Sequence, residues 1–348
     1  MNTHFETYLN KFEENDWLYT LDTLLPRIHE VDRNAAQIWF RFFPLSLFRH
    51  LQSAEDREKA KRGFAMLGKY ELKDQIDTSH SYLYGHRFWR TVKAAIEAES
   101  AVVQNDGVVL AEEIEQIAAM AAEKLKVDAS LVIGITAVGL MTLVQTGLEN
   151  FKAAGGEVSK PKGPMAQSPD RIVKSRADDD SQGLLGFLKT VNKNYSVIYD
   201  ETCSDGRFAI MNDQEMTGAS ALDRSQNWQE KDQRCWEGPI PVECTAASCG
   251  TCWVGVIAGQ EKLSEVSPRE RRQMKVFGYN QPEVPKPFLR LACQSKAFGN
   301  ATIVIPPWNG VFGKKIYANV EDRELEPATT SARALREVVH EAVKTELS

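Results

Sequence analysis

Val242–Trp253 reads VECTAASCGTCW and contains the strongest signal in the sequence. Its three cysteines follow the spacing Cys-x4-Cys-x2-Cys, and a fourth cysteine follows in the later segment LRLACQS. Four of the six cysteines of the chain therefore lie in one C-terminal region at spacings typical of metal ligands. The residues between them are small, so the backbone can wrap closely around a charged centre and present its N–H groups.

This region closely resembles the plant-type [2Fe–2S] ferredoxin family, which has the same ligand spacing. The resemblance includes the pair Gly250-Thr251 and the Leu-Ala-Cys-Gln around the fourth cysteine, and it covers roughly residues 195–307. It implies a β-grasp domain that carries one [2Fe–2S] cluster and transfers single electrons. The iron ligands that it implies are Cys244, Cys249, Cys252 and Cys293.

Structural zinc is an alternative occupant of these four cysteines. Zinc sites usually present their ligands as two close pairs, whereas here the grouping along the chain is three and one. Thiols without metal are a further alternative, and disulfides would leave the small residues of the loop unexplained. Cys203 and Cys235 lie outside the spacing, and we interpret each as a buried apolar cysteine and not as a ligand.

The sequence departs from the family in two features. The interval between the third and fourth cysteines is longer than in compact plant ferredoxins, and Tyr279–Pro287 (YNQPEVPKP) is the expected insertion. The helix expected in this interval is basic, whereas many ferredoxins present an acidic surface to their partners. Its basic residues are Arg269, Arg271, Arg272 and Lys275. Because docking follows surface charge, the family's partners cannot be transferred to this chain.

Changes in composition and periodicity predict an α+β chain with four parts. Residues 1–155 are expected to form an all-α domain, and residues 156–183, rich in Gly, Pro, Ser, Lys and Asp, a linker or extended arm. Residues 184–312 are expected to form the β-grasp, ferredoxin-like domain. Residues 313–348 form the remaining C-terminal extension, in which Thr330–Leu347 has the pattern of an amphipathic helix.

The N-terminal part has the periodicity of helices. Leu110–Leu125 and His86–Ala98 are predicted helices, and the apolar run Leu131–Val144 is predicted to be a buried core helix, since it is too short to span a membrane. Aromatic and aliphatic residues crowd Ile38–Leu51, with Pro44 interrupting them. This segment is either a core wall or a docking surface for another subunit.

The C-terminal part has the sequence patterns of β-strands and turns. Tyr195–Asp200 and Phe208–Met211 flank Asp205-Gly206 and predict a hairpin. Trp253–Ile257 and Ala301–Ile305 predict two further strands, and Ser267–Phe277 predicts a helix between them.

Charge and cysteine usage restrict the compartment and the partners. The formal net charge of −6 argues against nucleic acid as the main partner, because phosphate binding needs a basic excess. The first residues, MNTHFETY, contain no basic and apolar segments of a secretory signal. With its cysteines at ligand spacing, the chain is expected in the cytoplasm, where thiols remain reduced, and without a transmembrane segment.

These observations favour a non-catalytic electron-transfer protein or oxidoreductase subunit, and no catalytic residue is assigned. The expected partner is a redox protein or a multi-subunit oxidoreductase complex, and homo-oligomerisation stays open. Two other functions remain: an enzyme whose helical domain binds a second cofactor, and a redox sensor. His80 and His86 could be imagined as haem ligands, but six residues apart they do not share a helical face and are interpreted as core or surface histidines.

Overall fold

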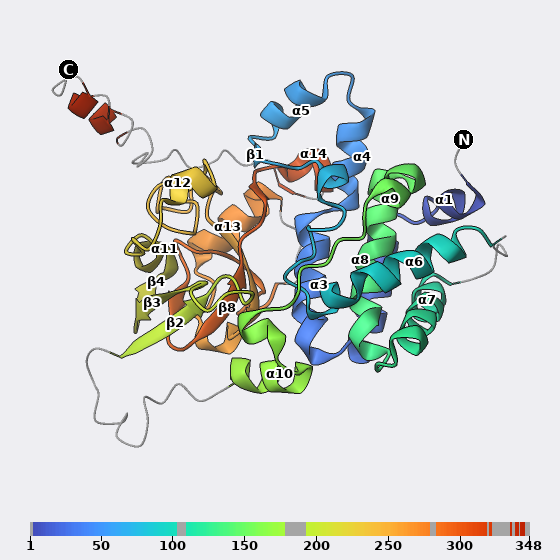
Figure 1. Cartoon of the computed structure of the whole chain (residues 1–348). Coiled ribbons are helices and arrows are strands. Elements are labelled where there is room, and N and C mark those ends of the chain that lie inside the picture. The colour runs from blue at the N-terminus through green and yellow to red at the C-terminus, as the bar shows by residue number, and fades with distance from the viewer. Residues whose placement is uncertain are drawn as a thin grey trace. The chain divides into compact units, whose positions relative to one another are not determined.

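The chain forms two compact units, shown in the computed structural model of Figure 1. The structure describes residues 3–102, 109–177, 193–278, 283–318, 320–321, 335, 338–340 and 342–344. Unit 1 consists of Met1–Glu55, Tyr70–Ser175 and Glu201–Ser204, and unit 2 consists of Asp56–Lys69, Arg176–Asp200 and Asp205–Ser348. The division does not follow the chain linearly, because unit 2 includes a segment from the N-terminal half.

Unit 1 is helical over its described residues. Its α-helices are α1 (His4–Leu9), α2 (Glu14–Leu24), α3 (Glu30–Phe42), α4 (Leu45–Ser53), α6 (Trp89–Glu99), α7 (Leu110–Leu125), α8 (Ser130–Thr146), α9 (Leu148–Ala153) and α10 (Pro169–Ala177), the last of which ends in residues assigned to unit 2. Short 3₁₀ helices are η1 (Leu25–Arg27), η2 (Leu72–Gln75), η3 (Tyr84–Phe88) and η4 (Gly163–Ala166). The helices predicted at Leu110–Leu125 and Leu131–Val144 are confirmed.

Helix α8 is the core of unit 1. Almost all of its residues are buried, as expected for a helix that is apolar on every side. Helices α3, α6, α7 and α9 all contact it, and a Cβ at Gly139 would lie 2.7 Å from Ile96 Cδ1 of α6. Gly139 is therefore a position of close helix packing. Among the described residues, none of the helices is both long and apolar enough to cross a membrane.

The aromatic segment Ile38–Leu51 forms a wall of the core. Trp39, Phe40 and Phe43 are buried, and the rings of Trp39 and Phe43 stack with centroids 4.9 Å apart. Pro44 occupies the N-cap of α4 and separates it from α3, because proline cannot continue the preceding helix. Since these side chains are enclosed within unit 1, the structure favours the core interpretation over a docking surface.

The segment expected to be a linker is partly helical. It contains η4 and α10, and Met165 and Ile172 pack with Val31 and Tyr84 in a small hydrophobic cluster of unit 1. The residues that follow, 178–192, lie outside the described residues. So do most of the expected C-terminal helix, Thr330–Leu347, and part of the expected insertion.

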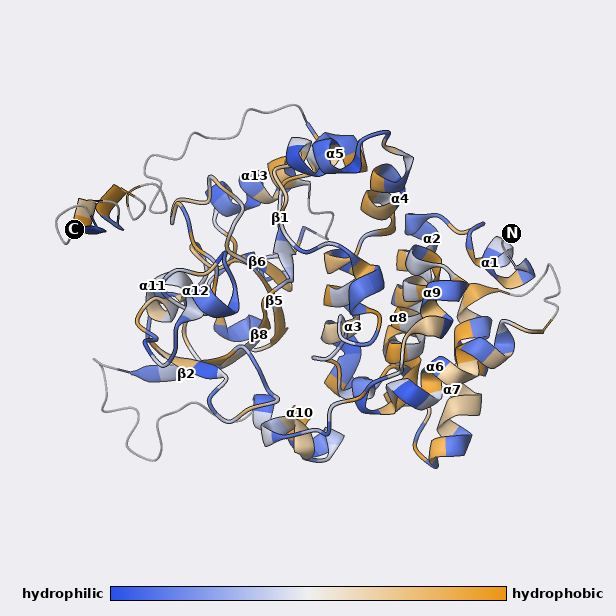
Figure 2. Cartoon of the chain, turned by 45° about the horizontal axis from the view of Figure 1, so that its top comes forward, coloured by the Kyte–Doolittle hydropathy of each residue, from blue (hydrophilic) through white to orange (hydrophobic). Residues whose placement is uncertain are grey.

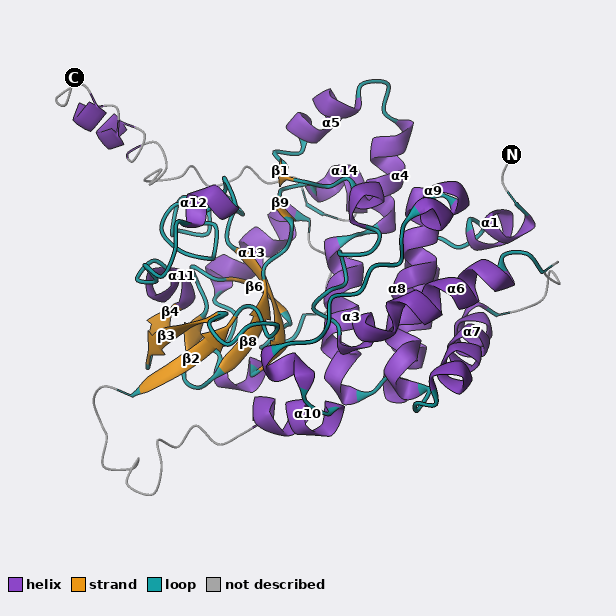
Figure 3. Ribbon diagram, viewed as in Figure 1, coloured by secondary structure: helices purple, strands orange, loops and turns teal. Residues whose placement is uncertain are grey.

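Unit 2 is built on a five-stranded mixed sheet, coloured orange in Figure 3. The strand order is β3 (Arg207–Met211), β2 (Asn194–Ile198), β8 (Ala301–Val304), β5 (Trp253–Ala258) and β6 (Leu289–Leu291). Strands β2 and β3 form the predicted antiparallel hairpin, β2 and β8 run parallel, and the remaining pairs are antiparallel. Two-stranded pairs are formed by β1 (Leu67–Gly68) with β9 (Trp308–Asn309) and by β4 (Gln214–Glu215) with β7 (Lys296–Ala297).

The helices of unit 2 are short. They are α5 (Arg57–Gly63), α11 (Met216–Ser220), α12 (Trp228–Lys231), α13 (Pro268–Phe277) and α14 (Gly313–Tyr317), with the 3₁₀ helix η6 (Gln260–Lys262). Helix α13 confirms the predicted helix, is N-capped by Ser267 and ends at Gly278, whose φ of 83° favours glycine. Figure 2 shows α5 predominantly in the hydrophilic colour.

Candidate metal centre

Two sheet strands position the four cysteines of the predicted ligand set. Cys252 directly precedes β5, whose residues are buried on both faces of the sheet. Cys293 lies two residues beyond β6, which pairs antiparallel with β5. Because Trp253 pairs with Leu291, the third and fourth cysteines meet although 41 positions separate them.

The four thiols are grouped as two pairs in space. Cys249 donates a hydrogen bond to Cys244, and Cys252 donates one to Cys293. Electrostatic coupling also links Cys252 with Cys249 and Cys293 with Cys244, so the two pairs adjoin each other. In the part of the chain that the structure describes, no three or more His, Cys, Asp or Glu side chains are arranged to hold one metal ion.

The hydrogen bond within each pair gives its two thiols different pKa values. The bond from Cys249 lowers the pKa of Cys244 to about 5 and raises the pKa of Cys249 itself. In the same way, the bond from Cys252 lowers the pKa of Cys293, and the pKa of Cys252 is raised well above its ordinary value by this bond and by burial. In each pair one thiol is therefore the more acidic of the two, and a metal that needs thiolate ligands must displace the protons that remain.

The loop around Cys244 directs backbone N–H groups at sulfur. The N–H groups of Ala246 and Ser248 lie 3.4 and 3.2 Å from Cys244 Sγ. Thr245, Ala247 and Gly250 have φ values of 52°, 59° and 67°. This left-handed backbone lets successive N–H groups point to the inside of the loop, where they stabilise negative charge. A positive φ is uncommon for alanine and an outlier for a β-branched residue such as threonine.

A buried ion pair holds the strand that leads to Cys293. Arg290 of β6 and Glu270 of α13 are fully buried and form two hydrogen bonds of 2.9 Å. Glu270 also accepts the N–H of Leu291 at 2.9 Å. Because one carboxylate binds both the side chain and the backbone of β6, it fixes the fourth cysteine relative to α13.

Three further residues support the loop from the protein side. Asn309 of β9 is buried and donates a 2.5 Å hydrogen bond to the carbonyl of Thr251. The Thr251 hydroxyl lies 2.9 Å from Cys249 Sγ. The ring of Phe277 lies against Gly250, where a Cβ would meet it at 3.3 Å. Sequence reasoning missed Asn309 and Phe277 because neither belongs to the cysteine spacing.

The two remaining cysteines differ in their surroundings. None of the six cysteines, all of which lie in the described part of the chain, forms a disulfide. Cys235 is buried, as predicted, with its pKa raised to about 12 chiefly by burial. The prediction that Cys203 is buried was wrong, because it is exposed. It lies in Glu201–Ser204, a short segment between the strands of the hairpin that clusters with unit 1.

His80 and His86 meet inside unit 1, although they share no helix. Their Nδ1 atoms are 3.0 Å apart, and His80 Nε2 lies 3.1 Å from the carbonyl of Ile76. Since a carbonyl only accepts, His80 must donate through Nε2 and accept from His86 through Nδ1. Burial is the main reason that the pKa of His80 falls to about 3 and that the pKa of His86 is also lowered. Both are buried histidines, and the ring of the first packs against Trp89 in a tilted arrangement with centroids 4.3 Å apart.

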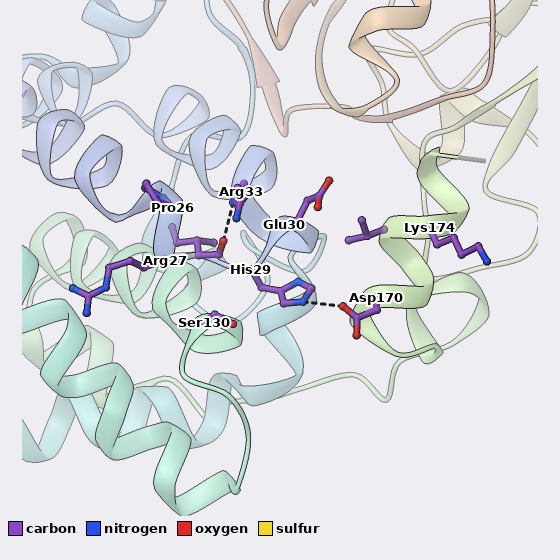
Figure 4. Close-up of a pocket in the computed structure, with 10 residues that line it drawn as sticks. Pro26, Arg27, His29, Glu30, Arg33, Ser130, Asp170 and Lys174 are labelled. Carbon is purple, nitrogen blue, oxygen red and sulfur yellow. Dashed lines mark hydrogen bonds and ion pairs between the residues drawn. The ribbon is translucent and has the colours of Figure 1, made fainter. Parts of the chain in front are cut away.

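A cavity of about 400 Å³ lies in unit 1 between the start of α3 and α10 (Figure 4). His29 caps α3 by accepting the N–H of Val31, and its Nε2 lies 3.3 Å from Asp170. Arg33 donates to the carbonyls of Leu25 and Ile28. His29 and Arg33 are thus engaged in interactions with the protein itself, and none of the predicted site residues lines the cavity.

Comparison with protein families identifies the region that contains the four thiols. Residues 225–298 match a family described as 2Fe-2S iron-sulfur cluster binding domain. This segment is a [2Fe–2S] ferredoxin-type domain. It binds a [2Fe–2S] cluster and supports an electron-carrying role, and the family implies a β-grasp fold. The chain as a whole is α+β, with a helical N-terminal part. Neither the curated proteins nor the solved structures gave a match.

Proposed function

We propose that the chain is a non-catalytic electron-transfer protein or subunit that docks to a larger oxidoreductase. The observation that supports this most directly is the arrangement of four thiols in two adjoining pairs inside the ferredoxin-type domain. A [2Fe–2S] cluster bound there supplies the uptake and release of one electron at a time. The protein's own residues set where and how readily this happens.

The donor set fits two irons better than one metal ion. In our proposal Cys244 and Cys249 hold one iron, and Cys252 and Cys293 hold the other. In each pair the two thiols already interact with each other, the first pair within the small-residue loop and the second between this loop and the end of β6. The N–H groups of Ala246 and Ser248 and the hydroxyl of Thr251 then donate to thiolate sulfur and stabilise added negative charge.

The loop has an accessible side and a closed side. Thr245 is exposed and Cys249 is half-buried, whereas Cys244, Cys252 and Cys293 are buried. On the closed side, Trp253 and Phe277 pack edge to face with ring centroids 5.9 Å apart. Electrons therefore enter and leave most directly at Cys249, the least buried of the four cysteines, which directly precedes Gly250 and Thr251.

The helical unit is our candidate for the docking module. Covalent attachment of the ferredoxin-type domain to a docking module replaces diffusional encounter by a high effective concentration at one partner. The four cysteines at metal-ligand spacing agree with a reducing compartment, and we propose the cytoplasm.

Anaerobic purification followed by iron, sulfide and spectral analysis tests this function. We expect two irons and two sulfides per chain, a visible spectrum of a [2Fe–2S] centre, and one electron taken up on reduction. Zinc without sulfide would contradict the proposal, and additional flavin or haem bands would favour an enzyme.

The ligand assignment has a matched control within the chain. Cys249→Ala should abolish or severely reduce iron content, whereas Cys235→Ala and Cys203→Ala should leave it intact. Cys235 is buried like most of the proposed ligands but lies outside the two pairs. Loss of iron in the Cys235→Ala variant with retention in Cys249→Ala would show that the ligand set is wrong.

A further inference from the structure

Three short helices of unit 2 give this acidic chain a basic surface. Helices α5, α13 and α14 together contain ten Lys or Arg residues and two Glu residues, in a chain whose net charge is −6. One of the two glutamates, Glu270, is buried in its pair with Arg290. We call the exposed basic residues of these helices the basic patch. They are Lys59, Arg62, Arg269, Arg272, Lys275, Lys314 and Lys315.

Direct contacts bring the three helices together, although α5 comes from the N-terminal half of the sequence. Lys315 of α14 donates to the carbonyl of Gly63 at 3.3 Å and lies over the ring of Phe64. The N–H of Phe312, just before α14, donates to the carbonyl of Phe277 at the end of α13. The three helices therefore lie next to one another in unit 2 (Figure 1).

Two ion pairs with glutamate involve basic residues of these helices. Glu58 pairs with Lys61, and Glu283 pairs with Lys275. The Lys275–Glu283 pair is exposed, whereas Lys61 in the other pair is half-buried, and ion pairs at a surface stabilise a fold only weakly. The helices still carry a clear excess of positive charge, which attracts anionic groups over roughly the Debye length of about 10 Å at 0.1 M salt.

The same elements support the loop of the metal centre. Phe277 at the end of α13 contacts Gly250, and Asn309, four residues before α14, binds Thr251. An anionic surface that binds the patch is therefore held next to the residues between Cys249 and Cys252. A redox partner that binds the patch therefore lies close to the loop of the metal centre.

We infer that the basic patch is the docking site for a redox partner protein with an acidic surface. This inference rests on the proposed electron-transfer function and names the class of partner. Nucleic acid is the weaker occupant, because it brings no redox centre to the loop and the remainder of the chain is acidic. In the transfer, one electron leaves the reduced centre and enters the partner's centre, and no bond is formed or broken.

Stopped-flow oxidation of the reduced, cluster-loaded full chain tests this inference. The probes are plastocyanin, an acidic blue-copper protein, cytochrome c, a basic haem protein, and a neutral quinone. With plastocyanin, the rate should fall on the order of tenfold as ionic strength rises from about 0.01 to 0.3 M, because salt screens attraction. With cytochrome c the rate should rise, and with the quinone it should stay constant.

Charge-reversal variants separate the effect of the basic patch from the effect of the net charge of the chain. In the triple variant Arg62→Glu, Arg272→Glu and Lys314→Glu, oxidation by plastocyanin should be at least about tenfold slower at low salt, and oxidation by cytochrome c should be faster. The matched control reverses three exposed basic residues on β3 and around α12, namely Arg207→Glu, Arg224→Glu and Lys231→Glu. It makes the same change in net charge and should change either rate less than about threefold. Quinone oxidation at the wild-type rate shows that each variant keeps its centre.

The outcomes distinguish the inference from the proposed function. Equal rates for the patch variant and the control with plastocyanin overturn the inference, while the proposed function stands. A DNA duplex that binds the wild-type chain but not the patch variant, without any preference for plastocyanin, assigns the patch to nucleic acid and also overturns it. Reduced chain that none of the three probes oxidises overturns the proposed electron-transfer function itself.

Discussion

Thr245 and Ala247 have backbone conformations that side chains disfavour, with φ values of 52° and 59°. Such residues persist only where the surroundings determine the backbone, and they concentrate at functional sites. Here the strained residues alternate with Ala246 and Ser248, whose N–H groups approach sulfur. The strain is therefore the cost of aiming donors at the thiolates.

Thr251→Val should lower the reduction potential of the bound cluster by on the order of 60 mV, a tenfold change for a one-electron couple. The Thr251 hydroxyl lies 2.9 Å from Cys249 Sγ, and valine keeps the shape but removes the donor that stabilises added charge. Protein-film voltammetry measures the shift. Thr251→Ser keeps the hydroxyl and serves as the control, so equal potentials for the two variants would contradict this role.

The His80–His86 pair should make the chain sensitive to acid. Because burial lowers the pKa of His80 to about 3, the folded state favours neutral imidazole, whereas the unfolded state takes up a proton near pH 6.5. The stabilisation is present above pH 6.5 and is lost as the pH falls toward 3. The free energy of unfolding should therefore decrease by about 1.4 kcal/mol for each pH unit below 6.5.

Urea denaturation at a series of pH values measures this dependence in the full chain. His80→Gln should remove most of the slope between pH 6.5 and 4.5, because its side chain does not titrate. His50 is exposed, and His50→Gln should leave the slope unchanged. Parallel slopes in the wild-type and His80→Gln chains would show that His80 does not titrate on unfolding. Asp77, which lies near His86, acts in the opposite direction and is present in all three proteins.

At the scale of elements, α13 connects the sheet to the metal centre at both of its ends. Glu270 in its first turn binds β6, and Phe277 at its last position packs on Gly250 and Trp253. The helix therefore links the strand before the fourth cysteine with the loop of the first three. A substitution at either end of α13 should therefore alter the positions of the cysteines and the retention of the cluster.

Glu270→Gln should destabilise unit 2 by about 3–5 kcal/mol, because it leaves the buried Arg290 guanidinium without a counter-charge. Chemical denaturation of the variant measures the loss, and iron analysis should show reduced cluster retention. Replacing both partners, as in Glu270→Gln with Arg290→Met, should recover part of the stability. A double variant that is less stable than the sum of the two single changes would contradict a direct pair.

Strands β1 and β9 form the second connection. A Cβ at Gly68, whose φ is 98°, would lie 2.6 Å from the carbonyl oxygen of Pro307. Gly68→Ala should therefore displace β9, release Asn309 from Thr251 and lower cluster retention, although Gly68 is far from the cysteines in sequence. Gly63→Ala is the matched control, because its Cβ would meet only the flexible end of Lys315 at 3.4 Å. Equal iron retention in the two variants would show that the position of β9 does not affect the loop of the metal centre.

At the scale of the whole molecule, the two units exchange segments. Asp56–Lys69 belongs to unit 2, and Glu201–Ser204 belongs to unit 1. The sequence predicted a ferredoxin-like domain of residues 184–312, and these boundaries stay a prediction. A ferredoxin-type domain cut at residue 184 would lack α5 and β1, and with them the partner of β9.

A fragment of residues 184–348 should therefore retain less cluster than the full chain and melt at a lower temperature. The missing β1 leaves the backbone groups of Trp308 and Asn309 without their sheet partners, and unpaired buried backbone groups cost about 1–3 kcal/mol each. Iron content per chain and thermal unfolding compare the two proteins. Equal values would show that the ferredoxin-type domain is complete without Asp56–Lys69.

Helices and strands with a regular hydrophobic period, and the turns that join them, were predictable from the sequence. Helix α7 has the predicted bounds, and the β2–β3 hairpin lies around Asp205-Gly206, because amphipathic periodicity and a turn signal are local properties. The ligand role of the four cysteines follows from their spacing and remains a prediction. Strand β1 has only two residues and thus no period, and the Asn309–Thr251 bond depends on that pairing. Cys203 was misplaced because its exposure is set by the fold around Glu201–Ser204.

The pairing of β1 with β9 also sets an order of events during synthesis. Leu67 and Gly68 leave the ribosome early, but Trp308 and Asn309 follow only near the end of the chain. At ordinary elongation rates the first strand waits on the order of tens of seconds for the second. Iron and sulfide inserted before β9 is translated would meet a loop that still lacks the support of Asn309, so cofactor loading is expected to follow the synthesis of β9.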